Sequence, residues 1–586
     1  MLFANTSDLF SVRESSGDLD HLVQLARDLA GRKLPFERMS VPRNIAARMF
    51  AYNPFKLYFI ATNTGPEDAI TLYKTGEFID LCRGPHIHNS IQVSGGIELE
   101  SVSGARWEPA LTDPEAPEGV ESAQPLARVS GISFVDQAHA VARADLVRKA
   151  RERDHRVVGK QQELFMFHKS SPGIPFMLPR GVRIVERLKT LMRDEYATGN
   201  YDEVVTPLVF GKEIWETSGH WENYREDMFV VSGAGESDTS HVQCQHGHDD
   251  SHAHAHVHGA SATPAEGVQG LKPMNCPGHC LVFANQARSY RELPIRLAEF
   301  SPLHRNEASG ALTGLTRVRA FHQDDAHIFC RPSQILTEIS ATLALISSTY
   351  DKLGFSQYDF VLSTRPAKSM GTREQWDEAE WDLSEALNRA GKPWTMNPAD
   401  GAFYGPKIDV HVTDALGRRH QTATVQLDFQ LPLRFGLHYA NEDGGREVPV
   451  IVHRAVLGSV ERMMAILCEH YGGKWPFWLS PRQAVVATVG NDARTVAHAE
   501  SVVKALRHGI TSSGRGHHVD LDASDSTVGK KVRSAQVAQY NFALVVGKKE
   551  VEKGTVSVRG RDGENLGEKT VESLLSMFRE LEDNYK

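Results

Sequence analysis

The sequence predicts a multidomain protein of mixed α+β and α/β class, in which helices flank a large antiparallel sheet and a smaller α/β domain follows. Two observations support this prediction of the fold class. The middle of the chain gives strands without a regular alternation with helices, whereas residues 483–586 alternate strands and helices. The length of 586 residues adds a third, because one core does not grow to that size and about three or four domains are expected.

The composition is that of an ordinary globular protein, with 41% hydrophobic and 24% charged residues. No apolar run approaches the ~20 residues that a membrane span needs, and no signal-peptide pattern follows Met1. Six irregularly spaced cysteines indicate a reducing compartment rather than a disulfide framework. Because the net charge is −9, contact with nucleic acid requires local basic patches.

Residues 1–137 are predicted to form a small α+β domain. Within it, the patterns predict a helix over residues 20–31, a strand over residues 56–62 and a solvated loop over residues 113–125. Residues 138–170 follow as a charged helical linker. Its charged face is compatible with a connection between domains or with a solvated helix surface.

The largest domain is expected over residues 171–480. Residues 201–209 read as a strand broken at Pro207, and residues 407–431 read as a β-hairpin around an Asp-Ala-Leu-Gly turn. A last helix over residues 459–471 ends at a Gly-Gly pair. These elements predict an antiparallel sheet flanked by helices.

Two further regions complete the chain. Residues 232–267 are rich in histidine and cannot bury a core, so they are expected to form a disordered surface insertion. The seven histidines from His241 to His258 could bind metal, although nothing in their spacing fixes a coordination geometry. Residues 481–586 are a separate α/β domain of ordinary size.

Nucleotide-binding glycine loops are absent: neither GxxxxGK[ST] nor GxGxxG occurs after a strand. A nucleotide must therefore be held by side chains on a sheet. The segment 296–329 reads as strand, glycine-containing loop and strand, and carries Arg305, Glu307, Arg317 and Arg319 near the loop. Guanidinium groups suit phosphate because they offer paired donors with a permanent charge. Ordinary charges of an edge strand would have the same spacing.

A cysteine-rich stretch, LKPMNCPGHC at residues 271–280, raises the question of a metal site. Close spacing is the usual signature of zinc and favours a local trio of Cys276, His279 and Cys280. A structural turn that happens to contain thiols is the alternative.

Several long stretches carry a family resemblance. KPMNCPGH, residues 296–329, GAFYGPKID, QLDFQLP and HRAVLGSVER followed by GGKWPFWLSPRQ together resemble the threonyl-tRNA synthetases, a class II family, and are most similar to its eukaryotic cytosolic form. The similarity runs from about Gly76 to the C-terminus, interrupted by the His-rich segment. Tyr201–Pro207 resembles the first class II motif, at the dimer interface, residues 296–329 the second, and Leu457–Arg462 the third.

The resemblance implies a zinc ion in the threonine pocket, held by Cys276, His327 and His453, with His279 and Cys280 packed against the helix that follows. Three protein ligands leave a position open for the amino group and hydroxyl of L-threonine. The resemblance makes Asp325 the acceptor for that hydroxyl. The other implied pocket residues are Met274, Gln323, Tyr404 and Gln426.

For ATP with Mg²⁺, the resemblance implies Arg305 at the α-phosphate, Arg462 at the γ-phosphate and Lys407 as a further cation. The remaining implied ATP-site residues are Glu307 and Phe321 at the adenine, with Arg317, Gln421, Gln426 and Ser459 nearby. The implied reaction joins threonine to the α-phosphate and then passes it to tRNA(Thr). Both steps depend on positioning and charge stabilisation, and no catalytic Ser or Cys is expected.

The C-terminal domain resembles an anticodon-binding domain, with Arg533, Glu550 and Arg559 at positions expected to read bases. Between Ser526 and Arg561 there are eight basic and two acidic residues, which suits a phosphate backbone or, alternatively, a solvated face.

Residues 1–137 resemble part of the family's editing domain, which hydrolyses seryl-tRNA. Residues 75–86 supply Asp80, Cys82 and His86, one half of that site. The other half is an upstream HxxxH helix, yet residues 1–74 contain only His21. Either the start is truncated or editing is lost, and impaired editing is expected in both cases.

The implied protein is a cytoplasmic homodimer, with a mitochondrial pool possible, that contacts no membrane. Two other hypotheses remain. A protein that binds tRNA or mRNA without catalysis would be favoured by loss of the zinc trio or the motif arginines, all of which are present. A zinc hydrolase would need a motif such as HExxH, which is absent.

Overall fold

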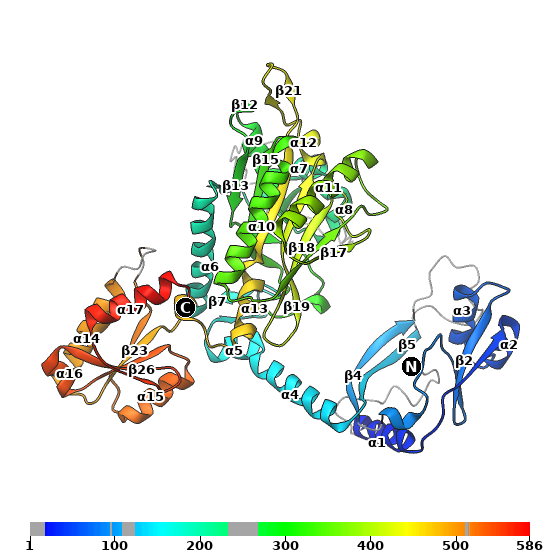
Figure 1. Cartoon of the computed structure of the whole chain (residues 1–586), viewed down its shortest axis with the longest axis horizontal. Helices are drawn as coiled ribbons and strands as arrows, with labels where there is room; N and C mark the ends of the chain where they lie inside the picture. Colours follow the sequence, from blue (N-terminus) through cyan, green and yellow to red (C-terminus); the bar gives the residue numbers. More distant parts are fainter. Residues whose placement is uncertain (1–17, 94–95, 108–123, 232–267, 510–513, 515) are drawn as a thin grey trace, which may run out of the picture. The chain divides into compact units, whose positions relative to one another are not determined.

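The computed structural model describes residues 18–93, 96–107, 124–231, 268–509, 514 and 516–586. The chain divides into two compact units, Met1–Lys149 and Ala150–Lys586 (Figure 1). Among the described residues, no helix has the length and apolar character needed to cross a membrane.

The first unit holds a small antiparallel sheet of β1 (Glu37–Pro42), β2 (Ala69–Thr75) and β3 (Phe78–Leu81). Its apolar side chains pack against helix α2 (Arg43–Met49) and helix α3 (Pro54–Asn63) around Phe50, Ile60 and Leu72. The unit also contains helix α1 (Asp18–Gly31), as expected, and a hairpin of β4 (Gly96–Trp107) and β5 (Gln124–Phe134).

The strand expected over residues 56–62 is wrong, because this segment lies within helix α3. The Asn53 side chain accepts a hydrogen bond from the Lys56 amide, and Pro54 occupies the first helical turn. A short apolar run suits a strand and a buried helix equally well, so the capping pair upstream of the run decides between them. The loop expected over residues 113–125 lies outside the described residues except for residues 124–125, which begin β5.

The expected charged linker is helical, as α4 (Gln137–Arg153) and α5 (His155–Gln161). The two helices are separate because Asp154 caps α5 by accepting from the Arg156 amide.

A nine-stranded sheet forms the centre of the second unit. The order is β17-β16-β18-β19-β22-β15-β13-β8, with β14 paired to β15. The strands are antiparallel except for two outer pairs, β16–β17 and β13–β8, and the predicted antiparallel sheet is confirmed. The strand bounds are β8 (Asp202–Glu203), β13 (Ile295–Glu299), β14 (Pro302–His304), β15 (Ala320–Cys330), β16 (Tyr358–Ser363), β17 (Trp394–Asn397), β18 (Lys407–Thr413), β19 (Arg419–Asp428) and β22 (Val450–Ser459).

Helices cover this sheet and complete its core. They are α6 (Pro179–Thr198), α10 (Ile335–Lys352), α11 (Arg373–Ala390) and α13 (Val460–Tyr471), whose apolar side chains share one cluster with the strands. The hairpin β18–β19 and the helix α13, which ends at Gly472, agree with the sequence predictions. Of the strand expected over residues 201–209, only the two residues of β8 join the central sheet, and Val209 begins β9 (Val209–Gly211) of another sheet.

The C-terminal part is an α/β domain with a five-stranded sheet in the order β24-β23-β25-β26-β27, as predicted. The strands are β23 (Ala484–Thr488), β24 (Val519–Asp522), β25 (Phe542–Val546), β26 (Thr555–Gly560) and β27 (Asn565–Thr570). Its helices are α14 (Ala493–His508), α15 (Val528–Val537), α16 (Lys548–Lys553) and α17 (Val571–Asp583).

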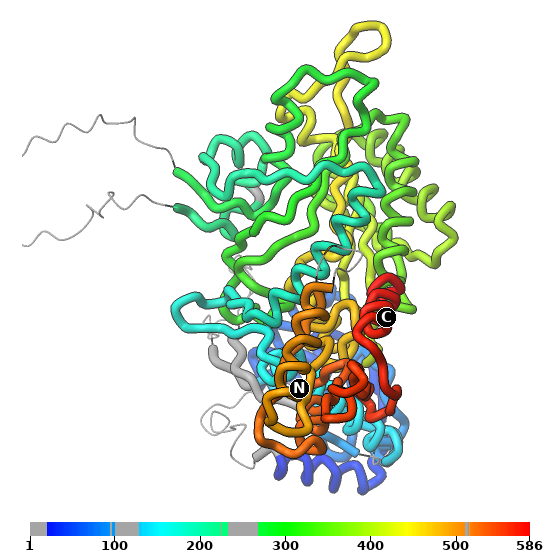
Figure 2. The backbone as a smooth tube through the Cα atoms, turned by 90° about the vertical axis from the view of Figure 1, so that its left-hand side faces the viewer, coloured from blue at the N-terminus to red at the C-terminus, as the bar shows by residue number. Residues whose placement is uncertain are grey.

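Buried polar contacts join this domain to the core. Arg187 of α6 pairs with Glu582 of α17 at 2.7 Å, and the two side chains are only 8% and 7% exposed. Gln483 Nε2 donates to the same carboxylate at 3.0 Å, and the Trp478 amide donates to the carbonyl of Lys586 at 3.1 Å. Figures 1 and 2 both show the C-terminus at this junction.

We therefore expect Arg187→Met to lower the free energy of unfolding by about 3–5 kcal/mol, because the buried Glu582 carboxylate loses its arginine and keeps only Gln483 and His517 as partners. Urea unfolding followed by tryptophan fluorescence measures the change. The matched control is Arg389→Met, which breaks an exposed pair with Glu385 on α11 and should cost less than about 1 kcal/mol. Equal effects of the two variants would contradict the prediction.

Candidate functional site

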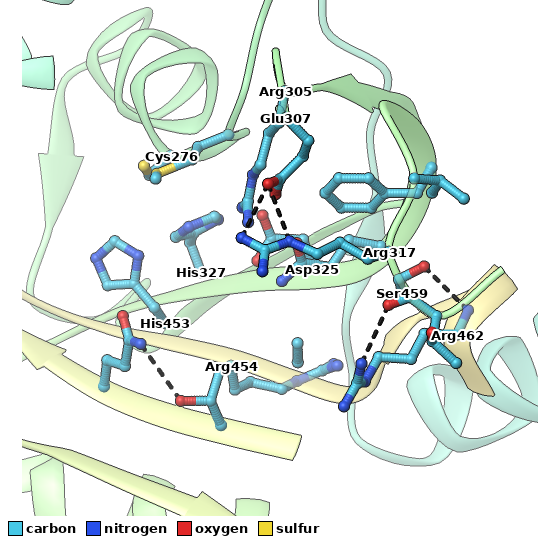
Figure 3. A pocket seen from close by; sticks show the side chains of 18 of the residues that line it. Cys276, Arg305, Glu307, Arg317, Asp325, His327, His453, Arg454, Ser459 and Arg462 are labelled. Atoms are coloured by element: carbon cyan, nitrogen blue, oxygen red, sulfur yellow. Dashed lines mark hydrogen bonds and ion pairs between the residues drawn. The ribbon is translucent and has the colours of Figure 1, made fainter. Parts of the chain in front are cut away.

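A hollow of about 440 Å³ lies over strands β15, β19 and β22 (Figure 3). Fourteen of the residues implied by the family resemblance line it. They are Met274, Cys276, Arg305, Glu307, Arg317, Phe321, Gln323, Asp325, His327, Tyr404, Gln426, His453, Ser459 and Arg462.

At one end of the hollow, the ligand atoms of Cys276, His327 and His453 all lie within 4.8 Å of one another. Cys276 begins helix α9 (Cys276–Ala284), which Asn275 and Pro277 start. His327 and His453 are directly opposite each other on the antiparallel strands β15 and β22, so their rings lie on one face, with centroids 4.6 Å apart.

The local trio that close spacing favours does not form this group. His279 and Cys280 lie within α9, and Cys280 shares an apolar cluster with Leu431 of the later helix α12 (Gln430–Arg434). His279 is behind His327, with 2.8 Å between their Nδ1 atoms. Cys280 is fully buried in an apolar cluster with Phe283.

The protonation states suit a metal. Burial, with a smaller effect of His453, holds the pKa of His327 well below its ordinary value, so the imidazole is neutral at pH 7. Burial raises the pKa of the Cys276 thiol, which a metal would have to deprotonate on binding. One thiolate and two neutral imidazoles are a donor set that fits zinc.

Two neighbouring aspartates on β15 face opposite sides of the sheet. Asp325 lines the hollow, and its Oδ2 accepts from Asn275 Nδ2 at 3.2 Å. Burial raises the pKa of Asp325 above its ordinary value. Asp324 instead accepts from the amides of Val456 and Leu457 at 2.8 and 2.9 Å. Strand alternation therefore gives only Asp325 to the site.

Tyr404 and Gln426 close the wall beside the trio. The Tyr404 hydroxyl donates to Gln426 Oε1, and its ring centroid is 5.6 Å from that of His453. Gln426 is the cross-strand neighbour of His453 in β19, which places the two side chains on the same face. Met274 lines the same end, and its sulfur is 3.1 Å from His220 Nε2.

The other end of the hollow is cationic (Figure 3). The Arg305 guanidinium lies 5.1 Å from the ring centroid of Phe321, and Arg317 pairs with Glu307 at 2.9 Å. Arg462 Nη1 donates to the carbonyl of Thr316 at 3.1 Å. Ser459 caps α13 by accepting from the Arg462 amide at 3.2 Å, which fixes Arg462 in the first helical turn.

Two predicted ATP-site residues do not line the hollow. Lys407 is opposite Gln426 in register, but its ammonium pairs with Asp409 at 2.9 Å and with Asp400 at 3.5 Å. Gln421 contributes its backbone carbonyl, which accepts from Arg462 Nε at 3.3 Å.

Sequence reasoning missed several residues of the site. Thr316, Val318, Thr424 and Ala455 also line the hollow. Asp428 holds His453 from behind, with 2.9 Å between its Oδ2 and Nε2 of the ring. Strand alternation from Gln426 would have indicated Thr424 and Asp428, since the three share one face of β19.

The predicted editing residues in the first unit lie near one another around β3. His86 Nε2 is 3.0 Å from the Cys82 sulfur, and the His86 ring stacks on Phe36. Asp80 pairs with Lys56 at 2.7 Å. Cys82 also lines a cavity of about 410 Å³ between α3 and β2.

The predicted anticodon residues lie on three elements of the C-terminal domain: exposed Arg533 on α15, half-buried Glu550 on α16 and half-buried Arg559 on β26. The Glu550 carboxylate caps α16 by accepting from the Gly547 amide at 2.9 Å.

Two of the eight basic residues counted in this domain are not part of a phosphate-binding surface. Lys531 is 3% exposed and donates to the carbonyls of Thr488 and Asp522, whereas Arg561 donates to the carbonyl of Trp475. The basic surface is smaller than the sequence count suggests.

Three family models match the chain. Residues 264–471 match the tRNA synthetase class II core domain (G, H, P, S and T) and residues 483–581 the anticodon binding domain. Residues 70–106 match the threonyl and alanyl tRNA synthetase second additional domain.

Whole-chain relatives agree with these matches. The chain is 46% identical over 574 residues to the probable cytoplasmic threonine–tRNA ligase 1 of Dictyostelium discoideum, covering 98% of this chain and 74% of that protein. It is also 46% identical over 567 residues to the mitochondrial threonine–tRNA ligase of Homo sapiens, covering 97% and 74%.

Solved structures are similar as well. A structure described as the RNA binding domain of threonyl-tRNA synthetase from Cryptosporidium parvum is 45% identical with a TM-score of 0.65, over 73% of this chain and 98% of that one. A putative threonyl-tRNA synthetase from Aeropyrum pernix is 26% identical with a TM-score of 0.59, over 74% and 96%.

Proposed function

The chain belongs to the threonyl-tRNA synthetase family of class II aminoacyl-tRNA synthetases, and from that membership we propose how its residues carry out threonine–tRNA ligation. Threonine and ATP first form threonyl-adenylate, and the threonyl group then passes to the terminal ribose of tRNA(Thr). The observation that carries the assignment of residues is the convergence of a thiol and two imidazoles at one end of the hollow, with arginines at the other.

Cys276, His327 and His453 would hold zinc, whose open position would bind the amino group and hydroxyl of threonine. Asp325 lies in the same hollow and would accept a hydrogen bond from the hydroxyl, while Met274, Gln323, Tyr404 and Gln426 line the pocket. Valine has the same shape without the hydroxyl and would leave these polar groups unpaired. A site built for a hydroxyl rejects such an analogue by about 10⁴–10⁵.

The cationic end of the hollow would bind ATP with Mg²⁺. Arg305 would contact the α-phosphate and the threonine carboxylate, and Arg462 would contact the γ-phosphate. The threonine carboxylate attacks the α-phosphorus and pyrophosphate leaves, so the arginines stabilise charge that develops on phosphate oxygens. Glu307 and Phe321 frame the adenine, and Arg317 and Ser459 lie beside it. Lys407 and Gln421 would reach ATP only after side chains move, because neither lines the hollow.

Residues 481–586 would bind the anticodon, with Arg533, Glu550 and Arg559 contacting bases. Support comes from the match to an anticodon-binding model and from the partial exposure of these side chains. Residues 171–480 would form the catalytic domain, joined through residues 138–170 to the partial editing domain of residues 1–137.

We also propose a homodimer through the segment that follows β8. Val205 is 84% exposed, and Leu208 and Val209 are 40% and 38% exposed, which gives an apolar strip at the edge of the central sheet. A cytoplasmic location, with a mitochondrial pool, fits relatives from both compartments.

The purified chain is expected to contain one zinc per subunit and to catalyse threonine-dependent exchange between ATP and pyrophosphate. Cys276→Ala should lose both, because two imidazoles alone do not hold the ion. Metal analysis and the exchange assay measure these outcomes. Active enzyme without zinc would contradict the assignment.

Asp325→Ala should reduce the preference for threonine over valine from about 10⁴–10⁵ by about 10–150-fold. The two amino acids have the same shape, and the variant loses one partner of the hydroxyl, a hydrogen bond to a charged group worth about 1.5–3 kcal/mol. The ratio of kcat/KM for the two amino acids in the exchange assay gives the result. Asp359→Asn, which alters an exposed aspartate on β16 of the same sheet, should leave the ratio unchanged. An unchanged ratio in Asp325→Ala would show that Asp325 does not recognise the threonine hydroxyl.

Editing of seryl-tRNA is proposed to be weak in a protein consisting of residues 1–586. Serine keeps the hydroxyl and lacks only one methyl group, which a pocket discriminates by only about 10–200-fold. Cys82 and His86 lie 3.0 Å apart, but residues 1–74 contain a single histidine instead of an HxxxH pair.

Incubated with seryl-tRNA, this protein should release serine at nearly the rate of buffer alone, and Cys82→Ala should not slow the release further. Efficient deacylation that disappears in Cys82→Ala would show that the half-site is sufficient.

A further inference from the structure

We propose that His279 is a positioning residue for the zinc site, which fixes the tautomer of His327 so that Nε2 of that ring presents its lone pair to the metal. The proposal rests on the zinc site proposed above and adds a second layer of residues behind the ligands.

The contacts form one buried chain of hydrogen bonds. His327 Nδ1 is 2.8 Å from His279 Nδ1, and His279 Nε2 is 3.0 Å from Glu299 Oε2. Glu299 Oε1 accepts from Lys272 Nζ at 2.9 Å and from the Thr206 amide at 2.7 Å. His279, Glu299 and Lys272 are each 0% exposed, so water does not compete for these bonds.

The donor and acceptor of each hydrogen bond can be assigned by starting from Glu299 at the far end of the chain. Lys272 pairs with Glu299 and balances its charge, so the two together bring no net charge to the buried chain. A neutral imidazole has one N–H, and a carboxylate can only accept. His279 Nε2 therefore donates to Glu299, and its Nδ1 must accept from Nδ1–H of His327. His327 Nε2 is then left without a proton, which is the form that binds a metal.

His453 is oriented by a carboxylate instead of a second histidine. Its Nε2 is 2.9 Å from Asp428 Oδ2, so Nε2 carries the proton and Nδ1 is left for the metal. Asp428 is itself held by the amides of Gln430 and Leu431, at 2.7 and 3.0 Å from Oδ1. The two ligand histidines would thus bind through different ring nitrogens, one set by a carboxylate and one by a second histidine.

The experiment follows zinc loss from the full chain to an excess of a coloured chelator. His279→Leu removes the acceptor and should release zinc about 10–100-fold faster than the unaltered chain. His279→Gln offers an acceptor and a donor and should fall between them. Cys280→Ala is the matched control, because Cys280 is the adjacent buried residue of α9 and makes no contact in the hydrogen-bonded chain; its release rate should be unchanged.

A second readout separates ligand orientation from general loosening. In Co²⁺-substituted protein, the visible absorption bands report ligand geometry, so His279→Leu should change the spectrum whereas Cys280→Ala should not. If His279→Leu gives no folded protein, the test is the comparison of His279→Gln with Cys280→Ala. Equal rates of zinc release from these two variants would overturn the proposal. If the unaltered chain holds zinc and Cys276→Ala does not, wild-type behaviour of His279→Leu overturns only this inference. An unaltered chain that takes up no zinc overturns the zinc site as well.

Discussion

The register between β15 and β22 is the constraint on which the candidate site depends. It sets His327 opposite His453, and it sets Asp325 opposite Ala455, whose small side chain leaves space above the strand. A shift of β15 by one residue against β22 would turn His327 and Asp325 to the face of the sheet away from His453. The packed helices α6, α10 and α13 bury that other face, so the register is enforced by the core rather than by the site.

Because side chains alternate between the two faces of a strand, the charged groups of the core are kept apart from those of the site. Asp324 and Arg454 point into the core, where Arg454 stacks over Tyr196 and Tyr201 at 4.6 and 4.4 Å from the ring centroids. The site face receives the metal ligands at one end and the arginines at the other. Helix α9 supplies the third ligand from outside the sheet. Hydrogen bonds from His279 connect this helix to Glu299 of β13 and, through Glu299, to Thr206 in the segment after β8.

Local patterns in the sequence predicted the antiparallel sheet, the β18–β19 hairpin and helix α13, because periodicity and turn residues act over short distances. The strand expected over residues 56–62 is a helix because Asn53 and Pro54 cap it. Spacing alone favoured Cys276, His279 and Cys280 as a trio, since strand register brings together residues that are far apart in sequence. Family resemblance indicated His327 and His453, but not the buried partners His279 and Asp428, and counting charges could not show that Lys531 faces inward.

The pairing of Arg187 with Glu582 bears on protein engineering. A chimera that exchanges the anticodon-binding part at residue 480 separates this pair and also removes the partner of the Trp478 amide at Lys586. Grafted modules would therefore need a donor whose final helix carries an acidic residue at the equivalent place, or a neutral side chain introduced on α6 together with the graft. Linker length alone would not restore a rigid joint between the recombined halves.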